Sequence, residues 1–168
     1  MSVVNGKALL ALSPIKGMFD SKQKAQKTSF GLSEVGYDVR IKQGLQFMRD
    51  GNGNKVTLVE SNGVVQRQIG WAVLVNVAEE FTMPPTLVGV GLPKSTWNRH
   101  HVRLGSPVIE PGWNGFLTIS LDYRGEETLF IPPGEGIMQV IFHAIGEEAA
   151  YAGRYQNQGN EIVGSKPV

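Results

Sequence analysis

The stretch Phe116-Leu117-Thr118-Ile119-Ser120-Leu121-Asp122-Tyr123 is a clear strand candidate, and much of the chain repeats its character. Apolar, β-branched and aromatic residues of this kind favour a pleated, half-buried strand. From Tyr37 onward, similar short runs are separated by Gly, Pro and Asn, which is typical of successive strands joined by turns. The expected strands are Tyr37–Lys42, Gln46–Arg49, Ala72–Ala78, Phe81–Met83, Leu87–Leu92, Phe116–Tyr123, Thr128–Ile131 and Met138–Ala144.

The segments between these strands complete the prediction of an all-β fold. Asp50–Asn54 predicts a turn between two strands, and Asp122–Glu127 around Gly125 predicts a solvated hairpin tip. Apart from a turn or two near the amino terminus, no segment shows the sustained apolar spacing of three and four that marks a helix. A β-sandwich or barrel with few helices is therefore expected.

The composition limits the possible functions. With 168 residues, 41% of them hydrophobic, the chain is predicted to form a single domain over residues 1–168. Lys and Arg total 16 against 15 Asp and Glu, and a net charge of +1 gives no field that would gather nucleic acid or membrane. The absence of cysteine excludes disulfides, thiolate nucleophiles and cysteine zinc sites. No membrane span or export signal is expected, so the predicted location is cytoplasmic.

The two ends of the chain are more polar than its middle. Residues 1–28 are interpreted as an N-terminal arm, whose lysine-rich part from Ser13 to Thr28 indicates a solvated surface stretch or a short helix. The segment 151–168 is rich in Gly, Asn and Gln, and it is expected to be loosely held.

The best candidate for an anion site is the segment Pro93-Lys94-Ser95-Thr96-Trp97-Asn98-Arg99. A β-protein without a Walker loop binds phosphate through cations and hydroxyl or backbone donors at a turn. Lys94 offers a point charge, Ser95 and Thr96 offer hydroxyls, and Arg99 offers a planar fork suited to two phosphate oxygens. An ordinary polar surface loop is the alternative, which composition alone does not exclude.

A second candidate segment has a carboxylate before a Pro-Gly turn and an aromatic residue after it. Its sequence is Val108-Ile109-Glu110-Pro111-Gly112-Trp113-Asn114-Gly115. A carboxylate fixed at a turn could orient a sugar hydroxyl or accept a proton from water, while Trp113 packs against a sugar or base. The alternative is a plain turn between strands.

The histidines do not predict a metal site. His100 and His101 are adjacent, so on a strand they would point to opposite faces, and His143 stands alone in an apolar strand. All three are interpreted as structural or surface residues, and no metal site made of protein ligands is expected.

Taken together, the motifs from about Phe30 to Gly159 resemble those of the dCTP deaminase and dUTPase superfamily, and the deaminase branch more closely. The first two motifs are specific in combination, and five motifs occur in order. They are Gly31–Arg40, Gly91–Arg99, Ile109–Ile119, Pro133–Phe142 and Tyr151–Gly159.

The resemblance implies a distorted, jelly-roll-like dUTPase-type β-domain that assembles as a homotrimer, with each site shared between neighbouring subunits. It implies a deoxynucleoside triphosphate substrate accompanied by Mg²⁺, which would be bound mainly through phosphates and water and not directly by protein ligands. By position, the phosphate ligands would be Lys94, Ser95, Thr96, Arg99 and Gln139. The remaining substrate-binding residues would be Glu110, Trp113, Thr118, Ile119 and Ser120, with Tyr151, Arg154, Tyr155 and Gln158 in the C-terminal lid.

Ser120 is the departure from the family that decides the expected reaction. In the deaminases, a glutamate at this position shuttles protons between water and the base. A serine hydroxyl is too weak a base for that role, and losing a general acid/base typically costs ~10²–10⁴-fold in rate. Asp122 would share a strand face with Ser120, but a displaced carboxylate there is the weaker alternative. The span from Arg99 to Glu110 is also shorter than in the deaminases, so Arg103–Val108 is predicted to shape a changed base pocket.

Hydrolysis at the α-phosphorus needs a carboxylate that activates water and a held triphosphate. Glu110 lies where dUTPases have an aspartate, so the catalytic residues are predicted to be Glu110, Arg99 and Ser95. The expected activity is that of a diphosphatase acting on dUTP or a modified dUTP. Two alternatives stay open: a dCTP deaminase with a rearranged proton shuttle, and a catalytically silent member that binds nucleotide or a partner protein for regulation.

Overall fold

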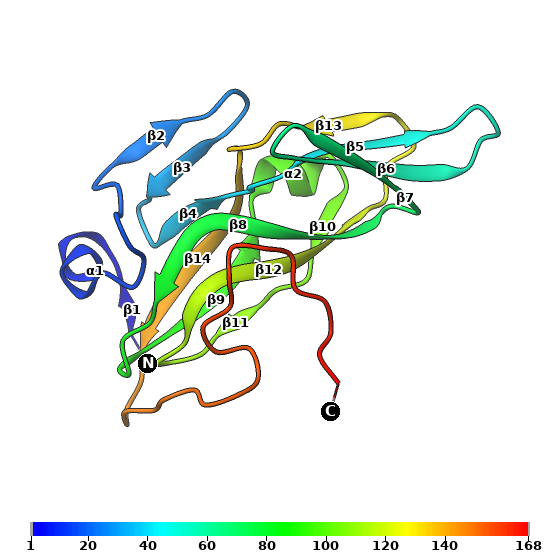
Figure 1. The fold of residues 1–168 in the computed structure, drawn as a ribbon. Coiled ribbons are helices and arrows are strands. Elements are labelled where there is room, and N and C mark those ends of the chain that lie inside the picture. Colours follow the sequence, from blue (N-terminus) through cyan, green and yellow to red (C-terminus); the bar gives the residue numbers. More distant parts are fainter. Residues whose placement is uncertain (1, 168) are drawn as a thin grey trace.

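The computed structural model describes residues 2–167, and strands dominate it (Figure 1). The elements in chain order are β1 Val3–Val4, α1 Gly6–Leu12, β2 Lys22–Lys24, β3 Ser29–Leu32, β4 Tyr37–Arg40, β5 Gly44–Arg49, β6 Lys55–Ser61, β7 Val64–Ile69, β8 Ala72–Thr82, β9 Leu87–Pro93, α2 Ser95–Arg99, β10 Val102–Leu104, β11 Val108–Ile109, β12 Asn114–Tyr123, β13 Leu129–Ile131 and β14 Gly136–Ala144. The predicted all-β class is confirmed.

Three antiparallel sheets make up the molecule. The largest has the order β11-β9-β14-β4-β3-β2, with β1 paired to β14; the second is β10-β12-β8, and the third is β13-β5-β6-β7. An antiparallel bridge between Ile41 and Val77 links the end of β4 to β8. Many strands pair with partners distant in sequence, which is the connectivity of a jelly-roll-like fold and not of a simple meander.

Each predicted strand is found, with small changes at the ends. Ala72–Ala78 and Phe81–Met83 are parts of one long strand, β8, which runs through Glu79 and Glu80. Several short or polar strands were not predicted, and the main omission is the hairpin formed by β6 and β7. The predicted Asp50–Asn54 turn is confirmed between β5 and β6, where the Asp50 carboxylate accepts hydrogen bonds from the backbone N–H groups of Asn52 and Asn54.

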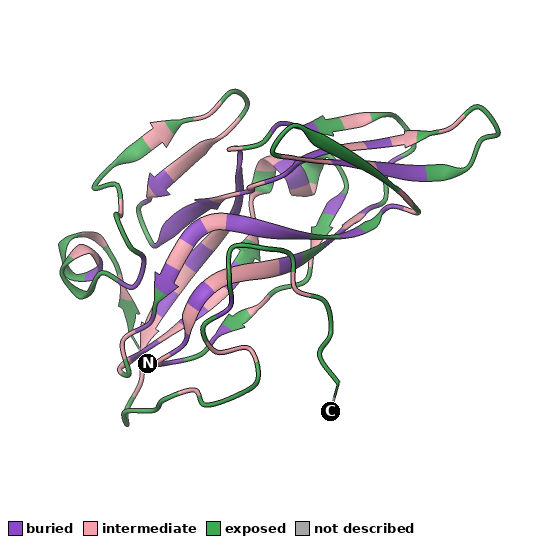
Figure 2. Ribbon diagram, viewed as in Figure 1, coloured by how far each residue is buried: buried purple, intermediate pink, exposed green. Residues whose placement is uncertain are grey.

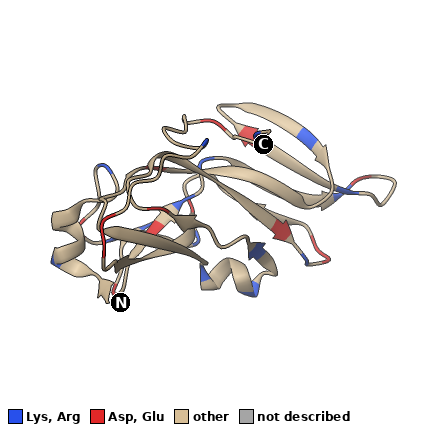
Figure 3. Cartoon of the chain, turned by 90° about the horizontal axis from the view of Figure 1, so that it is seen from below, with Lys and Arg blue, Asp and Glu red and all other residues tan. Residues whose placement is uncertain are grey.

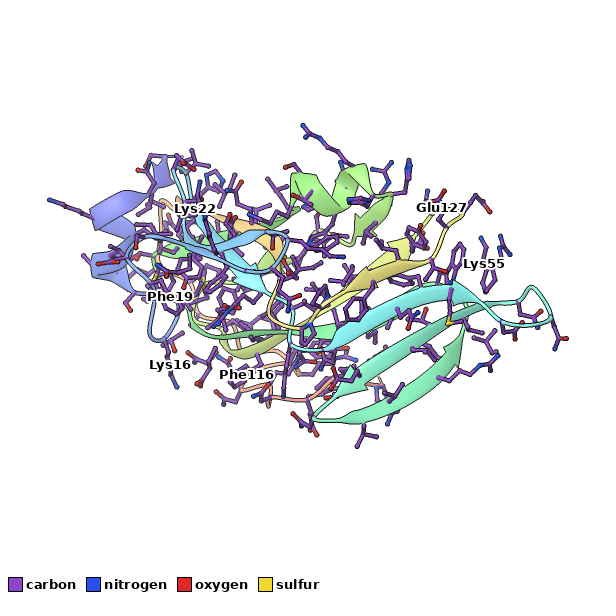
Figure 4. All side chains as sticks on the ribbon, turned by 90° about the horizontal axis from the view of Figure 1, so that it is seen from above. Lys16, Phe19, Lys22, Lys55, Phe116 and Glu127 are labelled. Atoms are coloured by element: carbon purple, nitrogen blue, oxygen red, sulfur yellow. The ribbon has the colours of Figure 1, made fainter. Side chains whose placement is uncertain are left out.

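The core lies between the sheets (Figure 2). It is built mainly from the inward-facing residues of β4, β5, β8, β12 and β14, because strand residues alternate between a buried and an outer face. Trp71 closes one end, and its buried indole N–H lies 3.0 Å from the Met48 carbonyl and 3.1 Å from the Val56 carbonyl. The β5–β6 end of the molecule, marked by Lys55 in Figure 4, lies opposite the end marked by Lys16 and Lys22.

The amino-terminal part of the chain is packed against the body. Leu9 of α1 and Ile15 are fully buried, and Ile15 forms a bridge with Phe81. The lysines of this region are exposed as expected, while β2 pairs with β3. The interpretation of the Ser13–Thr28 part as a solvated stretch is thus corrected: its side chains are solvated, but Ile15 and β2 tie its backbone to the body.

Two further expectations are corrected. Asp122–Glu127 is not a hairpin tip, because β13, which follows it, pairs with β5 and not with β12. The C-terminal segment is not loosely held: Gln158 forms a parallel bridge with Gly115 and its side chain is buried.

Charged residues of both signs are dispersed along the chain (Figure 3), in keeping with the net charge of +1. Within residues 2–167, no helix has the length and apolar character needed to cross a membrane.

Candidate active site

A pocket of about 370 Å³ lies on the outer face of the β8–β12 sheet, between these strands and the C-terminal segment that crosses in front of them (Figure 1). This cavity is called the main pocket. Its lining residues are Leu74, Val108, Ile109, Glu110, Trp113, Leu117, Thr118, Ser120, Tyr151, Tyr155, Gln158, Val163, Gly164 and Ser165. Seven of the residues predicted to bind substrate are therefore brought together in one place.

Glu110 stands at the rim of the main pocket on a tight turn. The Trp113 N–H donates to the Glu110 carbonyl over 3.2 Å, and Gly112 has a φ of 73°. Proline at the second position and a glycine of positive φ at the third are the residues that a type II turn requires. The Pro111-Gly112 sequence thus fixes the backbone at Glu110, while its side chain stays exposed.

The alternation along β12 decides which of its residues face the main pocket. Thr118 and Ser120 lie on the outer face, whereas Ile119 is buried in the core between them. Ile119 was predicted to bind substrate. Its side chain faces away from the pocket, so only its backbone is available on that side.

The C-terminal segment is attached to β12 and to the preceding turn by hydrogen bonds. The Gln158 amide donates to Thr118 Oγ1 over 2.7 Å, and the Phe116 N–H donates to the Gln158 carbonyl over 2.9 Å. Gly115 has a φ of 132°, and a Cβ there would lie 2.5 Å from the Gln158 carbonyl oxygen, so glycine is needed for this close approach.

Trp113 and Arg154 make contacts within the chain that were not predicted. The Trp113 side chain is buried against Phe81, and its indole N–H donates to the Tyr155 carbonyl over 2.7 Å, so the ring supports the lid more than it presents a stacking face. The Arg154 guanidinium binds the carbonyls of Lys166 and Pro167 and does not line the main pocket.

Most of the predicted phosphate ligands lie on or beside α2, in a segment that was expected to be a turn. An isolated helix of five residues would not be stable in water. It is held by Trp97, whose buried indole N–H donates to the Gly136 carbonyl over 2.8 Å. Helical spacing around this anchor leaves the Ser95 and Arg99 side chains exposed, with Thr96 half-buried.

Lys94 and Gln139 are held by two residues of the first motif. The Lys94 ammonium forms an ion pair with the buried carboxylate of Asp38 and lies 3.4 Å from Ser29 Oγ. The Gln139 amide donates to Ser33 Oγ over 3.0 Å. The other Asp38 oxygen, Oδ1, has no hydrogen-bond partner among residues 2–167. Lys94, Ser95, Thr96, Arg99 and Gln139, with Asp38 and Ser33, are called the cradle.

The main pocket and the cradle of one chain are far apart. Ile109 pairs with Gly89, so Glu110 lies level with Val88, and Lys94 is six residues further along β9 and its continuation. At ~3.4 Å per residue, this separation is roughly 20 Å. In Figure 1, α2 lies behind β8 while the C-terminal segment lies in front of it. A triphosphate attached to a sugar beside Glu110 is too short to reach the same chain's Lys94.

Glu110 supplies the only carboxylate among the lining residues of the main pocket. Asp122 shares the outer face of β12 with Ser120, as predicted, but its carboxylate accepts a hydrogen bond from Arg124 Nε over 2.8 Å and does not line this pocket. The group best placed to take a proton here is therefore Glu110.

Across residues 2–167, no cluster of three or more His, Asp or Glu side chains has the arrangement to hold a metal ion. His100 follows α2, and His101 has a φ of 62°, so they leave a helix and do not lie on a strand as assumed; both are exposed. His143 is half-buried in β14.

Several residues of these sites were not predicted. Leu74 and the segment 163–165 line the main pocket although nothing in their local sequence marks them, since only the folding of β8 and the C-terminal segment brings them there. For Asp38, the sequence carries a signal that the prediction did not use. Asp38 is a carboxylate between two apolar residues, which indicates a buried charge in need of a partner.

Comparison with known families gives a match over most of the same region. The family model described as dCTP deaminase-like matches residues 15–145, which is most of the chain. The chain belongs to the dCTP deaminase-like family. It is thus a member of the dCTP deaminase/dUTPase superfamily, as its motifs predicted.

Among curated relatives, the dCTP deaminase of Acidobacterium capsulatum is 27% identical over 168 aligned residues, covering 89% of this chain and 91% of the relative. The dCTP deaminase of Campylobacter lari is 30% identical over 146 residues, covering 77% of each chain. Among solved structures, the dUTPase of Staphylococcus bacteriophage 80alpha matches with a TM-score of 0.49 and 13% identity, covering 83% of this chain and 91% of that one.

Proposed function

We propose that this family member is a pyrimidine deoxynucleoside triphosphate diphosphatase, which converts dUTP or a modified dUTP to the monophosphate and pyrophosphate. The observation that carries the proposal is the make-up of the main pocket, where Glu110 is the single carboxylate among the lining residues. The motif resemblance aligns Ser120, another lining residue, with the deaminase glutamate. A pocket with one carboxylate at the sugar end favours activation of water near phosphorus over proton shuttling at the base.

In the proposed reaction, Glu110 accepts a proton from water as the water oxygen attacks the α-phosphorus. The bond from the α-phosphorus to the bridging oxygen breaks, and pyrophosphate leaves with the bond electrons. Arg99, Lys94 and the hydroxyls of Ser95 and Thr96 neutralise and orient the phosphates, which is the main source of catalysis in phosphoryl transfer. These groups belong to the cradle of a neighbouring chain, since one chain's own cradle is out of reach.

The proposal includes Mg²⁺ carried by the triphosphate. This ion prefers near-octahedral oxygen coordination and retains water, so phosphates and water can supply most of its ligands. Within the cradle, the unpartnered Asp38 Oδ1 is an acceptor that an ion-bound water would satisfy. The ion would neutralise charge that develops on the phosphates.

The test is incubation of the purified protein and Mg²⁺ with a panel of deoxynucleoside triphosphates, with pyrophosphate and ammonia measured separately. The expected result is pyrophosphate from dUTP or a 5-substituted dUTP without ammonia. Glu110→Gln should lower kcat by about 10²–10⁴-fold while triphosphate binding is retained. Full activity of Glu110→Gln would exclude Glu110 as the base, and tight binding with no product from any triphosphate would indicate a regulatory member.

A dCTP deaminase is the second candidate, because the family model and the curated relatives carry that name. This reaction also hydrolyses a bond, but the bond is between C4 and the exocyclic amine, and its product is ammonia. Release of ammonia from dCTP would favour this candidate over the diphosphatase. This holds whether pyrophosphate is released at the same rate or is not released at all.

A further inference from the structure

A second cavity, of about 520 Å³, adjoins the main pocket on the same face of the β10-β12-β8 sheet. It is called the side cavity. Its lining residues are Ala72, Val73, Leu74, Arg103, Leu104, Gly105, Ser120, Leu121, Asp122 and Arg124. Leu74 and Ser120 line both cavities, so the two spaces share one wall.

Leu74 and Ser120 form this shared wall, and Gly105 packs against Ser120. Leu74 and Ser120 are paired across β8 and β12, and both are exposed. Gly105 lies directly against Ser120: its N–H donates to the Ser120 carbonyl over 3.0 Å, and a Cβ on Gly105 would overlap Ser120 Oγ. A longer side chain at Ser120 or Gly105 would extend into the boundary between the two cavities, so serine and glycine leave this boundary less obstructed.

The side cavity is cationic. Its lining includes two arginines and one aspartate, and the aspartate, Asp122, is already bound to Arg124 over 2.8 Å. Arg103 donates from Nη1 to the neutral Asn98 Oδ1 over 2.6 Å, and none of the described carboxylates forms an ion pair with it. The charge of Arg103 is therefore available to a ligand that enters from the main pocket.

The direction of a bound nucleotide follows from the order of residues on the face of β12. Glu110 and Trp113 lie at the turn before β12, and Ser120 lies about 17 Å further along the strand from Gly115. With the sugar beside Glu110, as the proposed function requires, the edge of the base farthest from the sugar points toward Ser120 and the side cavity. In a pyrimidine this edge carries C4 and C5.

We propose that the side cavity is a subsite for a substituent on the C4–C5 edge of the pyrimidine, and that the preferred substituent is anionic or rich in hydrogen-bond acceptors. The substrate class is then an enlarged pyrimidine deoxynucleoside triphosphate, with the substituent passing over Ser120 to reach Arg103. This proposal rests on the proposed function for the orientation of the nucleotide, and it extends that function to the identity of the base.

The test compares substituents of similar length and opposite charge. 5-(2-Carboxyvinyl)-dUTP and 5-(3-aminoallyl)-dUTP test the C5 position, while N4-(2-carboxyethyl)-dCTP and N4-(2-aminoethyl)-dCTP test the C4 position. Both kcat/KM and the affinity for the α,β-imido analogues are measured, the latter by calorimetry. For at least one of the two positions, the carboxylate compound should exceed both its amine counterpart and the unsubstituted nucleotide by about tenfold, which is the contribution of one charge-assisted hydrogen bond.

Two variants place the effect in the side cavity. Ala72→Phe fills the cavity from a position outside the main pocket, and Arg103→Gln removes the charge while keeping a donor for Asn98. Both should abolish the preference for the carboxylate compound, and Ala72→Phe should leave the turnover of dUTP within about twofold. Arg67→Gln on the exposed strand β7 is the matched control and should keep the preference.

The outcomes separate this proposal from the proposed function. If dUTP is hydrolysed but carboxylate and amine compounds behave alike, the subsite is refuted and the diphosphatase stands. If the imido analogues show the preference but no triphosphate is hydrolysed, the subsite stands and the diphosphatase fails. A preference that survives both Ala72→Phe and Arg103→Gln would also overturn the subsite.

Discussion

Ser120 occupies the outer face of β12, where it lines both the main pocket and the side cavity, and its side chain sets the chemistry available there. A hydroxyl can donate or accept one hydrogen bond, but it cannot take a proton from water near neutral pH and return one to a leaving amine. Ser120→Glu restores a carboxylate at this position and should produce ammonia from dCTP at least about 10²-fold faster than the wild type. The measurement is ammonia release over time.

Ser120→Gln is the control for this substitution, because it has the same length without the basic group. It should release no more ammonia than the wild type. If the wild type and Ser120→Gln both deaminate dCTP as fast as Ser120→Glu, the proton shuttle lies elsewhere and the residue at position 120 does not decide the reaction.

Glu79 on β8 gives the protein a pH dependence of stability that is unrelated to catalysis. Burial raises the pKa of its carboxyl above the ordinary value of 4.5, and the hydrogen bonds from the Arg40 side chain and backbone N–H oppose this shift only in part. A folded-state pKa above the unfolded one stabilises the fold fully below the unfolded pKa, and this contribution is lost as pH rises through the folded pKa.

We therefore expect the Tm of the wild type minus the Tm of Glu79→Gln to decrease as pH rises from about 4.5. The wild type loses the contribution of the protonated carboxyl, whereas the glutamine does not titrate. Differential scanning calorimetry at intervals between pH 4 and 7 measures this difference. Carboxyls whose pKa is lowered, such as Glu34 beside Lys22, affect both proteins equally and cancel. If the Tm of the wild type minus the Tm of Glu79→Gln increased with pH, the raised pKa of Glu79 would be contradicted.

At the scale of elements, the C-terminal segment closes the main pocket without contributing much to the core. Tyr155 and Gln158 bind β12 and its turn through hydrogen bonds, while the buried apolar cluster ends at Phe142. Removal of residues 151–168 should leave the far-ultraviolet circular dichroism unchanged and raise KM for the triphosphate by at least about tenfold. Losing several charge-assisted or neutral hydrogen bonds is sufficient for that change.

Gln158→Ala is the milder form of this test, since it removes only the side-chain bond to Thr118. It should raise KM less than the deletion does, with kcat nearly unchanged. A deletion that unfolds the protein would show that the segment is part of the cooperative fold, and a deletion with unchanged KM would exclude a role as a lid.

The strands that sequence predicted well, such as β9, β12 and β14, are those whose own residues carry a continuous apolar and β-branched pattern, even though their partner strands are distant in sequence. β8 was predicted as two strands because Glu79 and Glu80 interrupt its apolar run. The strand continues because each charge finds a distant partner, Arg40 for Glu79 and Lys16 for Glu80. A short stretch of sequence does not show these pairings, because the partners are far apart in the chain. The same limit explains the wrong prediction of a hairpin at Asp122–Glu127, a segment that connects two different sheets.

The candidate site shows the same division between local and long-range information. The turn at Glu110 was readable because Pro-Gly requires one backbone geometry, and the cradle residues were readable as a motif. The helical form of Ser95–Arg99 was not, since five residues are too few for a periodic signal and Trp97 holds them through the carbonyl of Gly136. The outward alternation of Thr118 and Ser120 followed from β12, whereas Leu74 and the segment 163–165 needed the complete fold.

At the scale of the whole molecule, a single chain holds the main pocket and the cradle roughly 20 Å apart along β9. A site that needs both must then take its main pocket from one chain and its cradle from another, as the homotrimer implied by the motifs would provide. Closed rotational symmetry repeats this arrangement at every interface, so each subunit contributes to two sites.

Subunit complementation tests this arrangement directly. Glu110→Gln disables the main pocket and Arg99→Ala disables the cradle, so each variant alone should be inactive. When the two are mixed in equal amounts during assembly, a site is intact if its pocket comes from one variant and its cradle from the other. Random mixing should restore about a quarter of wild-type activity in a trimer with shared sites. Mixing Arg99→Ala with Ser95→Ala, both in the cradle, should restore no activity beyond that of the separate variants. If the site lay within one chain, Glu110→Gln and Arg99→Ala would stay inactive in every mixture, and an active monomer by light scattering would lead to the same conclusion.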